Sequence, residues 1–111
     1  MIDTFLKSPA SEAVRLIAYD KAQVVPGIVP ETWILIVSGE KPCVNMDVQL
    51  IPRIYIDKPD YWGIEVTGYV PGGICLTAVV PYTAELPLDG VIGKKGIEVI
   101  GAKNSAASSM G

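Results

Sequence analysis

The chain has 111 residues and a mass of 11.8 kDa, a size typical of one domain with one hydrophobic core. Half of the residues are apolar and 19% are charged, which excludes an intrinsically disordered chain. The formal net charge is −3, so the chain lacks the basic surplus that binds nucleic-acid backbones or anionic membranes. We therefore expect a compact domain whose partners include neither nucleic acid nor membrane.

The balance among the apolar residues predicts the fold class. Thirteen valines and thirteen isoleucines stand against seven leucines, and β-branched side chains fit a pleated sheet better than a helix. Eleven glycines and nine prolines supply turns along the chain. The composition predicts a mainly β domain, a small antiparallel β-sandwich or open barrel with at most one short N-terminal helix. An α+β fold is the alternative. Residues 1–100 should form this single domain and residues 101–111, which are small and polar, a disordered tail.

The first part of the chain carries a helix signal. Ser8 and Pro9 suit a helix cap and its first turn, and apolar residues recur at helical spacing as far as Ala18. We expect a short helix here, with a strand over residues 14–19 as the alternative. Two prolines exclude a helix over residues 24–30, which we expect to be an extended edge segment or a loop.

The middle of the chain predicts two strands joined by a turn. Residues 33–37 are apolar on both alternating faces, as in a strand covered on each side, so they are the candidate central strand. Residues 39–42 should form a turn. Residues 44–50 then alternate between apolar and polar side chains, with the even positions predicted to face inward. Pro52 should interrupt the strand or place it at an edge.

A further strand is predicted over residues 61–70, because Trp62, Ile64 and Val66 share one face of it. Gly72-Gly73 suits a two-residue hairpin with positive φ. In that hairpin register, Cys75 would lie in the core beside Val70.

The two cysteines, Cys43 and Cys75, have no Cys-x-x-Cys spacing. We expect them to be reduced, buried and inert, with a disulfide as the less favoured alternative. Residues 1–7 lack the layout of a secretory signal and no apolar run is long enough for a membrane helix. The expected location is the cytoplasm.

Histidine is absent from the sequence, which removes the usual base for a serine or cysteine nucleophile and the commonest nitrogen ligand of zinc. Two distant cysteines do not complete a zinc site. We therefore expect neither an enzyme with a familiar catalytic motif nor a metal or other cofactor.

One cluster of residues has the chemistry of a binding site, because carboxylates and aromatic rings surround a predicted turn. Its members are Tyr55, Asp57, Asp60, Tyr61, Glu65 and Tyr69. Such a cluster could stack a sugar on a ring and bind its hydroxyls with acids. The more ordinary interpretation is that the two aspartates cap the turn and the rings pack around it.

Three functions remain. The favoured one is a non-enzymatic structural or interaction subunit that self-associates as a dimer or larger homo-oligomer, because the mean hydropathy is +0.38 and a short chain leaves apolar surface uncovered. The alternative is a small-ligand or carbohydrate-binding module that uses the aromatic and carboxylate face. An enzyme subunit whose active site is shared with another chain or supplied by a cofactor comes third.

Overall fold

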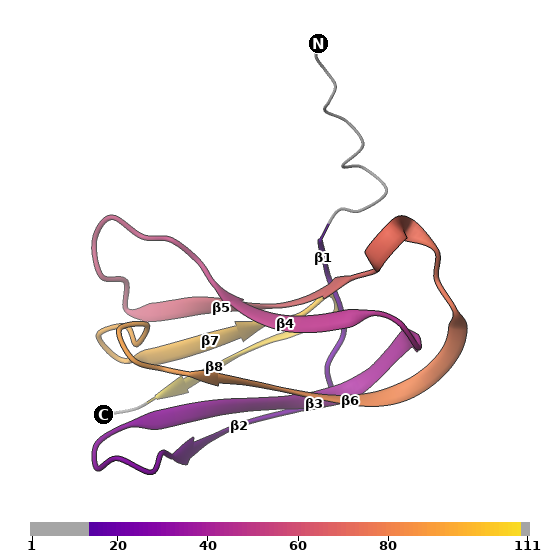
Figure 1. The fold of residues 1–111 in the computed structure, drawn as a ribbon. Helices are drawn as coiled ribbons and strands as arrows, with labels where there is room; N and C mark the ends of the chain where they lie inside the picture. The colour runs from indigo at the N-terminus through magenta and orange to yellow at the C-terminus, as the bar shows by residue number, and fades with distance from the viewer. Residues whose placement is uncertain (1–13, 110–111) are drawn as a thin grey trace.

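The computed structural model describes residues 14–109, and these form two β-sheets packed as a sandwich (Figure 1). The strands are β1 (Arg15–Leu16), β2 (Lys21–Pro26), β3 (Trp33–Cys43), β4 (Asp47–Pro52), β5 (Tyr61–Tyr69), β6 (Thr77–Pro87), β7 (Gly96–Ile100) and β8 (Ser105–Ser109). One 3-10 turn, η2 (Pro71–Gly73), is the only helical element of this part of the chain. Residues 14–109 therefore contain no helix that could cross a membrane. The predicted mainly β sandwich is confirmed.

The two sheets differ in size. Strands β2, β3 and β6 form a three-stranded antiparallel sheet with β3 in the centre. The second sheet has the order β4, β5, β7, β8, and the short β1 pairs with the end of β5 that lies beyond β7. The strand pairs are antiparallel, as predicted, except that β5 and β7 are parallel. The cause is β6, which carries the chain to the other sheet between them.

Strand β3 confirms the predicted central strand, but it is longer than expected. It continues to Cys43 and pairs with β6 along its length, with an irregularity between Lys41 and Cys43. The turn predicted at residues 39–42 is therefore wrong, because pairing to β6 overrides the local turn signal. Leu35 and Val37 face inward and are almost completely buried. Ile34 and Ile36 face outward and are only half-buried, so within residues 14–109 only one face of β3 is covered.

The core lies between the sheets and draws on both. Its buried apolar members are Ile17, Tyr19, Leu35, Val37, Cys43, Met46, Leu50, Ile64, Val66, Tyr82, Ala84, Leu88, Ile97 and Val99. Strand β5 contributes Ile64 and Val66 with no exposed surface, and Trp62 packs partly buried against them. The predicted inward face of β5 is thus confirmed. On β4, Leu50 is buried as predicted, whereas Val44, before the strand, is exposed.

The hairpin predicted at Gly72-Gly73 is wrong, although its backbone conformation is confirmed. Both glycines have positive φ, 73° and 76°. The chain after them, however, enters the other sheet, so β5 pairs with β1, β4 and β7 while β6 pairs with β3. A pair of glycines specifies a turn but not the partner of the strand that follows it.

The two ends of the described chain also differ from expectation. Residues 8–13 lie outside the described residues, and the remainder of the predicted helix is extended, with β1 at residues 15–16, as in the alternative. Part of the predicted disordered tail is ordered, since β8 pairs antiparallel with β7. Backbone hydrogen bonds to β7 hold this segment, which is why its polar composition did not reveal it. Residues 110–111 lie outside the described part.

The two cysteines form a disulfide between the end of β3 and the segment before β6. Cys43 is buried, whereas Cys75 is exposed. Asn45 reinforces the link, because its side chain donates to the Ile74 carbonyl and accepts from the Leu76 N–H. The prediction of two reduced core thiols is wrong, and the cytoplasmic expectation loses the support that it drew from them.

Candidate functional site

The predicted binding cluster is spread along the outer face of the five-stranded sheet. Glu65 and Tyr69 point outward from β5, since the neighbouring Ile64 and Val66 face the core. Tyr61 and Tyr69 stand at opposite ends of this strand, about 26 Å apart at the usual rise per residue. One small ligand therefore does not contact both rings.

The centre of the cluster is occupied by contacts within the chain. The Tyr55 hydroxyl accepts a hydrogen bond from the Gly63 N–H at 3.0 Å, and its ring packs edge-on against Trp62 with centroids 5.1 Å apart. Glu65 accepts a bond from Arg53 at 3.0 Å, and this bond raises the pKa of the Arg53 guanidinium. Both charged side chains are partly exposed, at 47% and 33%, so the pair contributes at most about 1 kcal/mol. These four side chains anchor the chain after β4 to the sheet.

The two aspartates lie in the loop between β4 and β5 and both are exposed. The Asp60 carbonyl accepts a backbone bond from Lys95 at 2.7 Å, and the Pro59 carbonyl accepts one from Lys94 at 2.8 Å. The backbone around Asp60 thus joins this loop to the loop before β7. No group of side chains suited to holding a metal ion occurs among residues 14–109.

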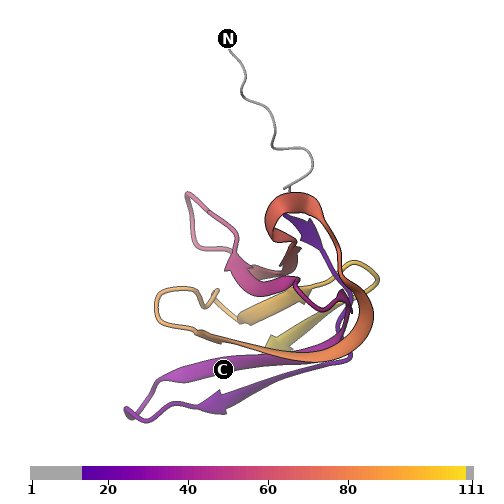
Figure 2. The ribbon, with the colours of Figure 1, turned by 45° about the vertical axis from the view of Figure 1, so that its right-hand side comes forward.

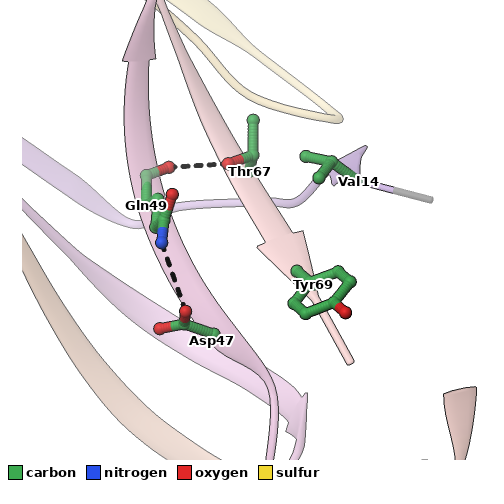
Figure 3. A pocket seen from close by; sticks show the side chains of 5 residues that line it. All are labelled: Val14, Asp47, Gln49, Thr67 and Tyr69. Carbon is green, nitrogen blue, oxygen red and sulfur yellow. Dashed lines mark hydrogen bonds between the residues drawn. The ribbon is translucent and has the colours of Figure 1, made fainter. Parts of the chain in front are cut away.

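A shallow pocket lies at the other end of the same sheet face (Figure 3). It measures about 240 Å³, and its lining residues are Val14, Asp47, Gln49, Thr67 and Tyr69. The Thr67 hydroxyl donates to the Gln49 carbonyl at 2.9 Å, and the Gln49 amide donates to the Asp47 carboxylate at 3.2 Å. Of the predicted cluster, only Tyr69 belongs to this sheet-face pocket.

The chemistry of the sheet-face pocket is that of weak polar recognition. Asp47 and Gln49 are exposed and already bonded to each other, so a ligand would have to compete with water and with that bond. The volume is below the range of roughly 300–1,000 Å³ that small-molecule sites occupy. The pocket is open and does not enclose a ligand.

Two buried phenols donate hydrogen bonds to backbone carbonyls. The Tyr82 hydroxyl donates to the Ala18 carbonyl at 2.8 Å, and burial raises its pKa to about 12. The Tyr19 hydroxyl donates to the Val99 carbonyl at 3.2 Å, and burial, reinforced by the Glu98 charge, raises its pKa as well. Both phenols are uncharged at neutral pH. Their hydrogen bonds tie Ala18 and Tyr19, which follow β1, to β6 and β7.

The most exposed apolar side chains lie at one end of the sandwich, which we call the loop end. It comprises the loops of residues 27–32, 53–60 and 89–95, which emerge on the same side in both views (Figures 1 and 2). Ile28, Ile54 and Ile56 are 100%, 97% and 102% exposed. The sequence analysis did not single out these residues. The available signal was a loop context, because Pro26 and Pro30 closely flank Ile28, and Pro52 and Pro59 flank Ile54 and Ile56.

A small groove continues the loop end onto the three-stranded sheet. It measures about 190 Å³ and lies where the turn between β2 and β3 meets the end of β6. Its walls are mostly apolar and include Ile28, Trp33 and Pro87, and Asp89 also lines it. The loop end thus combines apolar loop tips with an apolar depression.

Comparisons of the chain with protein-family models, with curated proteins and with solved structures found no match.

Proposed function

We propose that the protein is a non-enzymatic interaction subunit that self-associates, with the loop end as the contact between copies. The observation that carries this proposal is the complete exposure of Ile28, Ile54 and Ile56. Burying an isoleucine side chain stabilises a protein by about 1.5–3 kcal/mol. Three isoleucines that stay in water therefore leave a large free energy of burial unused. A second copy that covers them would supply the missing burial.

The charges of the loop end favour another copy over a strongly charged partner. Its three loops carry four basic and four acidic residues, namely Arg53, Lys58, Lys94 and Lys95 against Glu31, Asp57, Asp60 and Asp89. A surface with both signs in equal number can meet itself about a two-fold axis without net repulsion. Apolar tips surrounded by mixed charges are the usual anatomy of a protein interface.

The test removes the apolar tips without touching the core. Ile54→Ser together with Ile56→Ser changes two exposed side chains, so folding should be retained. The matched control is Ile74→Ser together with Leu76→Ser, two exposed apolar residues at the opposite end of the sandwich. We expect light scattering coupled to gel filtration to show a lower mass for the loop-end variant and an unchanged mass for the control.

Two outcomes contradict the proposal. An unchanged mass in the loop-end variant would place the contact elsewhere. Loss of association in the control alone would move it to the opposite end, near the disulfide. Both variants need a far-ultraviolet circular dichroism spectrum like that of the parent for the comparison to hold.

The second candidate function is a small-ligand or carbohydrate-binding module, and the sheet-face pocket is the observation that favours it. Tyr69 and Asp47 there supply a ring and an acceptor. Titration with simple sugars, followed by amide NMR shifts at Gln49 and Thr67, tests it. The absence of a cofactor remains part of the proposal, whereas the Cys43–Cys75 disulfide favours an oxidising compartment over the cytoplasm.

A further inference from the structure

Three of the four long edge strands carry prolines at their free edges. Prolines lie in β2, β4 and β6 at Pro26, Pro52, Pro81 and Pro87. Hydrogen bonds near each strand fix which backbone groups point outward: Gly27 donates to Thr32, Arg53 to Gly63, and Leu88 to Trp33. Because bonded and non-bonded pairs alternate in an antiparallel ladder, every one of these prolines directs its ring nitrogen to the free edge. An approaching strand meets a ring instead of an N–H donor.

Strand β8 is the exception. Its sequence, Ser-Ala-Ala-Ser-Ser, has no proline and no charge. The Gly101 N–H donates to the Asn104 carbonyl, so Ala106 and Ser108 form the bonded pairs with β7, while Ser105 and Ala107 turn their N–H and C=O groups to the free edge. Residues 105–108 are all exposed. Two adjacent outward-facing positions of a paired strand are thus open to a further strand.

We propose that the β8 edge pairs antiparallel with the β8 edge of a second copy, joining the two five-stranded sheets into one. The contact is self-complementary, since a two-fold axis beside Ala107 places each outward N–H opposite a C=O of the other copy. Uncharged side chains on both strands add no repulsion, and small ones let the edges approach. Among residues 14–109, β8 is the only long edge strand that has neither a proline nor a charged residue.

This inference rests on the proposed self-association and names a second contact for it. The loop end and the β8 edge are different surfaces, and two different two-fold contacts on one chain generate an assembly larger than a dimer. Each contact can be removed alone, so the two proposals fail separately.

Ala107→Pro tests the edge directly. The Ala107 N–H points outward, so proline there removes no bond to β7 but blocks the approaching strand. Ala107→Thr is the matched control, because threonine keeps the N–H and favours strands. We expect light scattering to show a parent larger than a dimer, an unchanged Ala107→Thr variant and an Ala107→Pro variant reduced to the loop-end dimer. An Ala107→Pro variant with the mass of the parent would overturn the inference while leaving the loop-end contact intact.

Amide hydrogen exchange gives a second measurement on the unaltered protein. The outward amides of Ser105 and Ala107 should exchange at least tenfold more slowly at high protein concentration than at low concentration. The inward amides of Ala106 and Ser108 serve as internal references, since β7 protects them in both conditions. Exchange at Ala107 that does not change with concentration contradicts the pairing, whether or not the proline variant folds.

Discussion

Replacing Cys75 with alanine removes the disulfide that joins the end of β3 to the segment before β6, and it should cost much of the stability of the domain. The cysteines are 32 positions apart. A closed loop of that length restricts the unfolded chain by about 3.7 kcal/mol in the chain-entropy treatment. Domains of this size have a total stability of about 5–15 kcal/mol. Because Cys75 is exposed, its replacement leaves no cavity, and the measured loss should reflect the link itself.

The assay is urea unfolding followed by tryptophan fluorescence, with the free energies extrapolated to water. Cys43→Ala is the informative comparison, because Cys43 is buried and its loss adds about 1 kcal/mol for the cavity. The parent protein in a reducing buffer should fall to the value of Cys75→Ala. The extrapolated unfolding free energies have a precision of roughly 1 kcal/mol. A Cys75→Ala variant whose unfolding free energy lies within that margin of the oxidised parent would refute the reasoning. So would two reactive thiols in the denatured parent without reductant.

Three further changes test the core, the phenols and the loop end. Val66→Asp places an unpaired carboxylate in a fully buried site and should cost several kcal/mol in urea unfolding, whereas Val79→Asp on the surface should cost little. Burial raises the pKa of Tyr82 from 10.0 to about 12. Tyr82 therefore ionises in the unfolded state at a lower pH than in the fold, and the free energy of unfolding should fall between pH 10 and 12. Tyr82→Phe should flatten that part of the pH profile. Gly93→Ala puts a Cβ 2.5 Å from the Asp60 carbonyl and should lower the melting temperature by forcing the two loops apart.

The predictable parts of the fold are those in which one segment carries its own signal. The apolar run from Trp33 to Val37 predicts a central strand, and alternation over residues 61–70 predicts the inward face of β5. Positive φ at Gly72 follows from the glycine itself. In each case the physical cause is local, so one stretch of sequence contains it.

The unpredicted parts depend on segments that are far apart in the sequence. The Cys43–Cys75 link requires the pairing of β3 with β6 to bring the two residues together. Strand β8 depends on the ladder that β7 offers, not on its own composition. The continuation of β3 past Gly39 has the same origin, because β6 supplies the partner. Tertiary pairing decides such elements, and a turn or tail signal does not reveal it.

The candidate site illustrates the same limit. Tyr55, Glu65 and Tyr69 have the residue types of a binding face, and the sequence correctly placed the last two on one side of a strand. It did not show that Arg53 engages Glu65 or that Tyr55 bonds to the backbone of Gly63. These contacts already engage the side chains of the cluster. The isoleucines of the loop end, in contrast, remain exposed to solvent.

The most direct test of self-association is the mass of the unaltered protein in solution, measured by light scattering over a hundredfold dilution from high micromolar concentration. One chain has a mass of 11.8 kDa. Self-association predicts a mass of at least two chains at the highest concentration, falling as the sample is diluted. A mass of one chain at every concentration would contradict it and would leave the sheet-face pocket as the better candidate for function.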